Sequence, residues 1–203
     1  ISPFAMNATA CLVAIFVNQR LLEYGGDLAV GAFGIANRVA FIFIMINFGV
    51  NQGMQPIAGY NYGAQNYDRL MRVLKLAMIA GTCVTTSGFI VAEFMPHLCV
   101  RLFTNDKVLT DLAVNGIRIM MAAMPIVGYQ MIVTNFFQSI GKAKISIFLS
   151  LSRQLLFLVP LIGVMPVFFG VNGVWVAMPI SDSFSAIFAL VMMVRYMRVF
   201  KKR

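Results

Sequence analysis

Long apolar runs separated by short polar gaps dominate the chain. Each of the six runs approaches or exceeds the roughly 20 residues that a helix needs to cross the hydrocarbon core of a bilayer. None alternates apolar and polar residues as a membrane β-strand does. Backbone N–H and C=O groups in lipid must be satisfied internally, so every run is expected to be helical. The predicted helices span residues 2–19, 28–50, 70–95, 108–137, 145–169 and 171–195.

The composition supports this pattern. Of the 203 residues, 60% are hydrophobic and only 11% are charged, whereas soluble domains carry roughly a quarter charged residues. A soluble fold of this size could not keep so much apolar surface from water. The sequence therefore predicts an all-α membrane protein that forms a bundle of six transmembrane helices in the lipid bilayer.

Basic residues gather on one side of the predicted bundle, in the second gap, the fourth gap and the C-terminal tail. Ten of the 16 lie there, namely Arg69, Arg72, Lys75, Lys142, Lys144, Arg195, Arg198, Lys201, Lys202 and Arg203. The opposite side has Arg20, Arg101 and Lys107. The positive-inside rule puts the ten in the cytoplasm, together with both chain ends. The net charge of +9 thus indicates orientation, and no nucleic-acid partner is expected.

A few ionisable residues lie inside the apolar runs, where a charge costs a few kcal/mol on insertion scales. They are Arg38, Arg118, Arg153 and Asp182. Arg153 and Asp182 lie at comparable depth on consecutive antiparallel helices. We therefore expect an ion pair that fixes these two helices, with a charged cavity lining as the alternative.

One polar stretch interrupts the apolar pattern after the second run. It contains the sequence "GVNQGMQPIAGYNYGAQNYDRL", residues 49–70. Glycine and tyrosine suit a turn at the membrane interface, with the rings at headgroup level. We expect Pro56 to loosen the helix, and Gly59 and Gly63 to end it. This interpretation does not explain the amide side chains that still fall within the helix.

The same stretch resembles the end of the second helix of each lobe in the MATE (multidrug and toxic compound extrusion) family. Two further stretches are similar to that family: "YGGDLAVGAFGIANRVAFIF" and "FFQSIGKAKISIFLSLSRQLLFLVPL". The resemblance covers nearly the whole chain, which looks like the C-terminal six-helix lobe of a twelve-helix transporter, and it implies a location in a bacterial inner membrane. The chain starts without an initiator methionine, as if cut from a longer protein whose N-terminal lobe lies upstream.

The resemblance implies secondary active export of organic cations or other amphipathic compounds in exchange for H⁺ or Na⁺. The two lobes of such a transporter enclose a central cavity and alternate access by rocking. Candidate cavity residues are Asn7, Asn37, Arg38, Tyr129, Gln130, Asn135 and Gln154. For each amide or hydroxyl, a hydrogen bond between helices is an equally open interpretation.

Ion coupling needs a buried carboxylate, and some family branches carry acids in the first and fourth helices of this lobe. The corresponding stretches here, "MNATACLVAIF" and "PIVGYQMIVTN", contain none. An aspartate beside a guanidinium does not readily take a proton near neutral pH. We therefore expect Asp182 to be structural and the coupling ion to bind mainly in the other lobe.

Three alternatives remain open. A lipid-linked oligosaccharide flippase of the same superfamily would need many basic residues in its cavity, and only Arg38, Arg118 and Arg153 qualify. A membrane enzyme would need a nucleophile, an acid–base pair or a metal cluster. His97 is the only histidine, and the three cysteines are scattered, so no metal or cofactor is expected. A lobe without its partner would be inactive, because one lobe cannot enclose a cavity.

Overall fold

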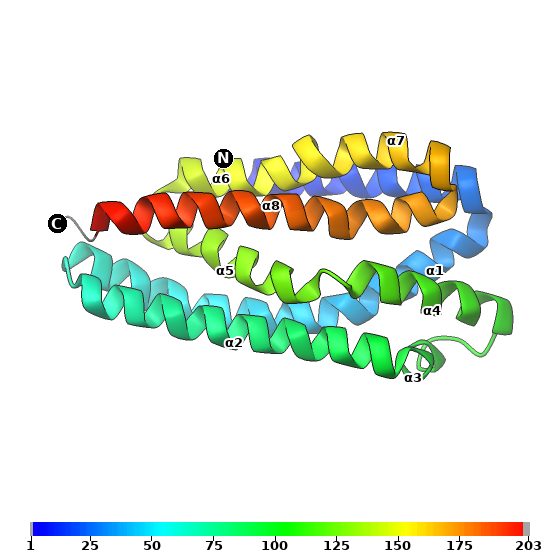
Figure 1. The fold of residues 1–203 in the computed structure, drawn as a ribbon, viewed down its shortest axis with the longest axis horizontal. Helices are drawn as coiled ribbons and strands as arrows, with labels where there is room; N and C mark the ends of the chain where they lie inside the picture. The colour runs from blue at the N-terminus through cyan, green and yellow to red at the C-terminus, as the bar shows by residue number, and fades with distance from the viewer. Residues whose placement is uncertain (1, 201–203) are drawn as a thin grey trace.

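The computed structural model describes the backbone of residues 2–200 and the side chains of residues 8–197. Within these residues the chain is helical and contains no strand (Figure 1). The elements are α1 (Ser2–Gly63), α2 (Tyr67–Phe94), α3 (Pro96–Arg101), α4 (Lys107–Met121), α5 (Met124–Ser139), α6 (Ala143–Leu151), the π-helix η1 (Ser152–Leu158), α7 (Val159–Phe169) and α8 (Val171–Phe200).

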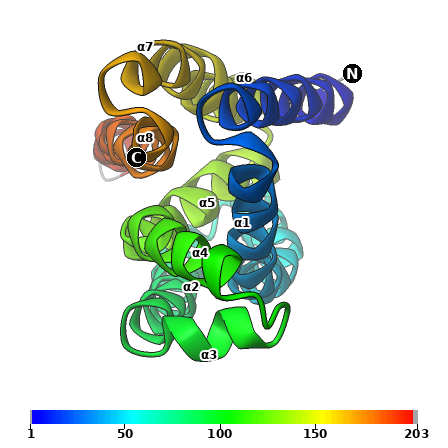
Figure 2. The ribbon, with the colours of Figure 1, turned by 90° about the vertical axis from the view of Figure 1, so that its right-hand side faces the viewer.

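Helix α1 folds back on itself at Gly26 and so provides two antiparallel arms. Gly26 has φ 66° and ψ −168°, a conformation that glycine adopts without the steric cost of a Cβ. Figure 1 shows the chain reversing direction there, and Figure 2 shows the first arm beside α6 and α7. The arms, residues 2–25 and 27–63, correspond to the first two predicted helices.

The second arm is longer than expected, because the polar stretch after residue 50 continues the helix to Gly63. Of the two glycines expected to end this helix, Gly63 does so, whereas Gly59 lies within it. Its amide side chains bond their own helix: Asn51 Nδ2 donates to the Asn47 carbonyl at 3.1 Å, and Asn61 Nδ2 donates to the Ile57 carbonyl at 2.8 Å. Amide groups that donate to carbonyls of their own helix do not interrupt the backbone ladder, and the turn follows at residues 64–66.

The fourth and fifth predicted helices are each interrupted. Helices α4 and α5 meet at an angle of 50°, just before Pro125 in the first turn of α5. A proline at that position lacks only an N–H that would have no helical partner. The fifth span is continuous over residues 143–169 but contains the seven-residue π-helix η1, which the sequence did not predict.

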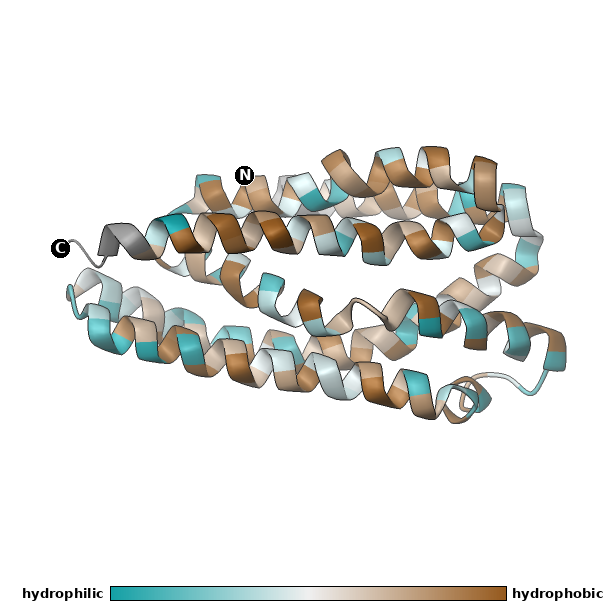
Figure 3. Ribbon diagram, in the orientation of Figure 1, coloured by the Kyte–Doolittle hydropathy of each residue, from teal (hydrophilic) through white to brown (hydrophobic). Residues whose placement is uncertain are grey.

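The helices are long and apolar enough for a membrane protein. Four of them meet this criterion, and the bent pair α4–α5 makes a fifth span. Because α1 folds back at Gly26, its two arms give one further segment across the bundle, which makes six. Figure 3 shows hydrophobic residues over most of the length of α7 and α8. The predicted fold class is confirmed.

Two apolar clusters fill the bundle, one toward each end. One contains Leu21, Ile117 and Trp175, and the other contains Leu70 and Phe137. Helices α1, α5 and α8 each contribute residues to both clusters. On each of these helices, buried polar residues lie between the residues of the first cluster and those of the second. These polar residues are Asn47 and Asn51 on α1, Gln130 on α5, and Ser181, Asp182 and Ser185 on α8. The lobe thus has a polar layer near its middle.

Candidate functional site

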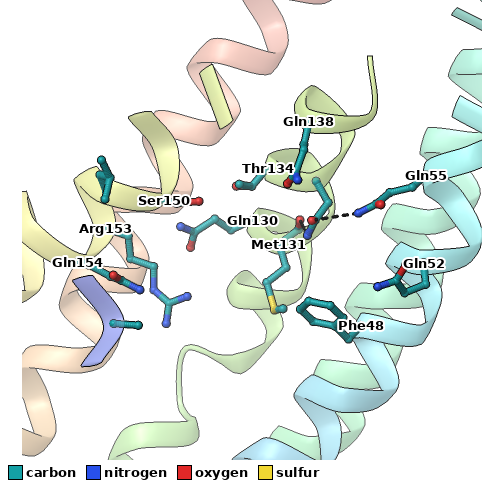
Figure 4. Close-up of a pocket in the computed structure, with 13 residues that line it drawn as sticks. Phe48, Gln52, Gln55, Gln130, Met131, Thr134, Gln138, Ser150, Arg153 and Gln154 are labelled. Carbon is teal, nitrogen blue, oxygen red and sulfur yellow. Dashed lines mark hydrogen bonds between the residues drawn. The ribbon is translucent and has the colours of Figure 1, made fainter. Parts of the chain in front are cut away.

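A cavity of about 480 Å³ opens within this polar layer. Both arms of α1, together with α5, α6 and η1, form its walls, as Figure 4 shows. Six amide side chains line it, and we call it the amide cavity: Gln52, Gln55, Gln130, Asn135, Gln138 and Gln154. Phe48 and Met131 add apolar surface, and Thr134 and Ser150 add hydroxyl groups.

Hydrogen bonds hold part of this wall in place. Gln55 Nε2 donates to Asn135 Oδ1 at 3.4 Å, which joins the second arm of α1 to α5 (Figure 4). Asn135 Nδ2 donates to the Met131 carbonyl of its own helix at 2.9 Å. Gln130, only 3% exposed, donates from Nε2 to Ser185 Oγ on α8. The amides on α5 therefore serve both as cavity lining and as links between helices.

Two amide oxygens in this region have no hydrogen-bond partner among the described residues. They are Gln130 Oε1 and Gln154 Oε1, and both are buried. A buried acceptor without a donor costs about 1–3 kcal/mol. A polar group that reached either oxygen would therefore gain a hydrogen bond.

The ion pair expected from the sequence is present. Arg153 Nε lies 2.8 Å from Asp182 Oδ1, with the two side chains 36% and 12% exposed. The Ser181 hydroxyl donates to the Arg153 backbone carbonyl at 2.9 Å. Two consecutive residues of α8 thus hold the first turn of η1, where the π-helix leaves the regular α-helical pattern.

A second cavity, of about 310 Å³, adjoins the first. Most of its lining is apolar, including Phe33, Ile44 and Met178, and we call it the apolar cavity. Arg153 and Gln154 line both cavities, so they form the shared wall between an amide-rich space and an apolar one.

The structure brings together some of the predicted site residues. Gln130, Asn135 and Gln154 line the amide cavity, and Asn37 lines the apolar cavity. Tyr129 instead packs against the apolar cluster around Phe137, and it lines neither space.

Two more candidates lie elsewhere. Arg38 is exposed and lines neither cavity, and the side chain of Asn7 falls outside the described residues. Sequence reasoning missed Gln52, Gln55 and Gln138 as cavity residues. The spacing of Gln52 and Gln55, three residues apart on one helix, was the available signal.

Arg118, another arginine within an apolar run, lies outside both cavities. Arg118 lies 4.0 Å from Glu93 Oε1 and donates to the Glu93 carbonyl at 3.4 Å. Within the described part of the chain, no group of three His, Cys, Asp or Glu side chains could hold a metal ion. The three cysteines are free thiols.

Comparison with known proteins gives a consistent result. The MatE family model matches residues 4–162. The multidrug export protein MepA of Staphylococcus aureus (strain N315) is 24% identical over 190 residues, which cover 94% of this chain and 42% of the relative. The MepA of Staphylococcus haemolyticus is 23% identical over 190 residues, covering 94% of this chain and 41% of the relative. The chain thus spans less than half the length of these curated relatives.

Solved structures have the same fold. The MATE multidrug transporter DinF-BH in complex with rhodamine 6G superposes with a TM-score of 0.85 at 37% identity, over 98% of this chain and 45% of that one. A MATE protein in complex with MaL6 superposes with a TM-score of 0.91 at 20% identity, over 98% of this chain and 45% of that one. In both cases one chain of this length matches a single lobe of the longer protein.

Proposed function

The chain belongs to the MatE family, and from that premise we propose that it forms one lobe of a secondary transporter that exports amphipathic compounds from the cell. The amide cavity is the observation that carries this proposal. It is a polar space of about 480 Å³ inside a bundle whose outer surface is largely apolar. Such a space can lower the cost of moving a polar group through the hydrocarbon region.

The relatives support export in particular, since they are named as multidrug export proteins, and such proteins are not enzymes. We propose the same activity for the complete protein that carries this chain. Its remaining part would be the N-terminal lobe, and the two lobes would rock about a cavity between them.

We propose antiport against H⁺ or Na⁺, with the coupling ion bound mainly in the other lobe. Among the described residues, Asp182 is the one carboxylate that lines either cavity, and it is already paired with Arg153. Asp111 and Glu93 lie elsewhere, Asp111 near the α3–α4 loop and Glu93 beside Arg118. The described part of this lobe thus offers no unpaired cavity carboxylate.

A flippase for lipid-linked oligosaccharides is the less favoured candidate. Binding a pyrophosphate calls for several basic side chains around one cavity. Of the three intramembrane arginines, Arg153 lines the cavities, whereas Arg118 is paired with Glu93 and Arg38 is exposed elsewhere. One guanidinium does not make such a site.

The decisive experiment uses the complete reading frame. We expect six further helices to be encoded upstream, and the complete protein to export rhodamine 6G, the ligand of the DinF-BH structure, from drug-sensitive cells. Export is expected to stop when the gradient of the coupling ion, either H⁺ or Na⁺, is collapsed. The 203-residue chain expressed alone serves as the control and is expected to be inactive. Export by the complete protein that is independent of both gradients would contradict the proposal.

A further inference from the structure

Among the described residues, the amide cavity has one charged side chain in its lining, and that side chain is basic. The other lining groups are amides, hydroxyls and apolar groups, and none of them is Asp or Glu. Arg153 therefore brings the one formal charge of this lining, and its counter-ion Asp182 lines the adjoining apolar cavity instead.

The two charged side chains of the Arg153–Asp182 pair differ in exposure and in the cavities that they line. Asp182 is 12% exposed and lines the apolar cavity alone, whereas Arg153 is 36% exposed and lines both cavities. The contact joins Arg153 Nε to Asp182 Oδ1. Figure 4 shows the guanidinium of Arg153 reaching from η1 toward the middle of the amide cavity. The positive end of the pair thus faces that cavity.

Side-chain contacts from α8 hold Arg153 in this orientation. Ser181 and Asp182 are adjacent on α8, and they bind the backbone carbonyl and the side chain of Arg153 respectively. The π-helix brings Arg153 and Gln154 to the same wall. π-Helical segments occur frequently at functional sites. A guanidinium that the protein holds in place loses little entropy when it binds a ligand.

We propose that Arg153 binds the carboxylate group of the transported compound. The planar guanidinium matches a carboxylate in charge and shape, and the neighbouring Gln154, whose Oε1 has no hydrogen-bond partner among the described residues, can donate to the same oxygens from its Nε2. The inference deepens the proposed function and rests on it. Among the amphipathic compounds that the transporter exports, it assigns the tightest binding to those that carry a carboxylate, zwitterions included.

The adjoining apolar cavity supplies the second half of such a site. Because Arg153 and Gln154 form the shared wall, a carboxylate bound at Arg153 would lie at the border of both spaces. The apolar body of the compound would then fit against Phe33, Ile44 and Met178. A compound without the carboxylate would offer the guanidinium of Arg153 no partner of opposite charge.

The test compares two dyes that differ at one group. Rhodamine 6G is a xanthene dye whose carboxyl is blocked as an ethyl ester, and hydrolysis of that ester gives the matched free acid. The complete transporter is purified in detergent, and the affinity for each dye is measured by fluorescence anisotropy. The wild type is expected to bind the free acid about 10-fold more tightly than the ester, the size of effect that a charge-assisted hydrogen bond provides.

The main variant removes both members of the pair, Arg153→Gln with Asp182→Asn, so that no charge is left unpaired. We expect its preference for the acid over the ester to fall close to 1. Arg153→Lys keeps the charge without the fork and is expected to retain part of the preference. Arg118→Gln with Glu93→Gln removes an ion pair outside the cavities and is expected to keep the full preference.

Equal affinity of the wild type for acid and ester would overturn the proposal, and so would an unchanged preference in the Arg153→Gln/Asp182→Asn variant. The proposed function is read separately, from dye transport in proteoliposomes under an imposed ion gradient. Absence of transport of both dyes would refute the export function. The ratio of the affinities for the free acid and the ester would still decide whether Arg153 recognises a carboxylate.

Discussion

Asp182 lies inside an apolar bundle, and its removal leaves the guanidinium of Arg153 without its partner. Breaking a buried pair is destabilising, and here the cost is reduced because Arg153 is 36% exposed. We expect Asp182→Asn in the complete protein to destabilise the fold by about 1–3 kcal/mol. We expect the larger effect on folded yield, which is measured by size-exclusion chromatography in detergent. We expect the smaller effect on the pH dependence of export per folded molecule.

The double variant Arg153→Gln/Asp182→Asn serves as the control, because it removes both charges together. Its folded yield is expected to exceed that of Asp182→Asn alone. The structural role of Asp182 would be refuted if the single variant reached the membrane in normal amount, still bound the dye, and had lost only its response to the ion gradient.

Ser181 and Ser183 allow a matched comparison on one helix. The Ser181 hydroxyl donates across to the Arg153 carbonyl at 2.9 Å, whereas the Ser183 hydroxyl donates to the Pro179 carbonyl of its own helix at 2.7 Å. Loss of the first bond removes a hydrogen bond between α8 and η1. We expect Ser181→Ala to cost about 1 kcal/mol, or roughly 2–4 °C in thermal stability.

Ser183→Ala is expected to have a smaller effect, because a back-bonded serine adds little to helix stability. Both variants are compared by thermal unfolding in the same detergent. Equal shifts for the two serines would show that the contact between Ser181 and η1 contributes nothing specific.

At the scale of elements, α2 and α5 approach closely at Gly128. A Cβ at this position would overlap with Thr85 Oγ1 and would lie 2.7 Å from the Gly81 carbonyl oxygen. Overpacking of this kind costs typically about 1–3 kcal/mol. We therefore expect Gly128→Ala to lower the thermal stability, although alanine is the better helix former.

Gly34→Ala provides the control, since a Cβ at Gly34 would meet nothing within 4 Å. It should leave stability unchanged or raise it slightly, by up to about 1 kcal/mol from helix propensity. If Gly128→Ala were as stable as Gly34→Ala, the contact between α2 and α5 would be looser than the structure indicates.

The sequence predicted the helices well and their internal geometry poorly. Runs of apolar residues near the length of a bilayer crossing leave few alternatives to a helix, so the fold class followed. The helix after residue 50 continued because Asn51 and Asn61 bond carbonyls of their own helix, which a polar composition does not reveal. The π-helix around Arg153 depends on contacts with Ser181 and Asp182, far along the chain.

The cavity residues were predictable only in part, for a related reason. A polar residue on an apolar helix must face protein or water, and that rule found Gln130, Asn135 and Gln154. It cannot tell a cavity wall from a contact between helices, so Tyr129 was included although it packs in an apolar cluster. Which helix faces which space is a property of tertiary packing.

On the scale of the whole molecule, the outer surface agrees with a bilayer environment. Large apolar side chains are exposed along several helices, for example Leu12 at 66%, Ile79 at 53% and Phe168 at 74%. A water-soluble lobe would not expose apolar residues in this way over so many elements. Lipid and the second lobe are the partners that such a surface fits.

The orientation of the lobe in that bilayer follows from its basic residues. The turn at residues 64–66, the turn at residues 141–142 and the C-terminal end of α8 lie at one end of the bundle in Figure 1, and α3 lies at the other. The first end holds more of the Lys and Arg residues, so we predict that it faces the cytoplasm.

Single-cysteine labelling checks this orientation in a complete protein from which Cys11, Cys83 and Cys99 have been replaced. A cysteine at Gln65 or Ala143 should react with a membrane-impermeant maleimide only after the cells are opened. A cysteine at Asn105, in the exposed loop between α3 and α4, should react in intact cells. The reverse result would place the basic end outside, and the positive-inside rule would then fail for this lobe, because ten Lys and Arg residues would have crossed the membrane against the potential.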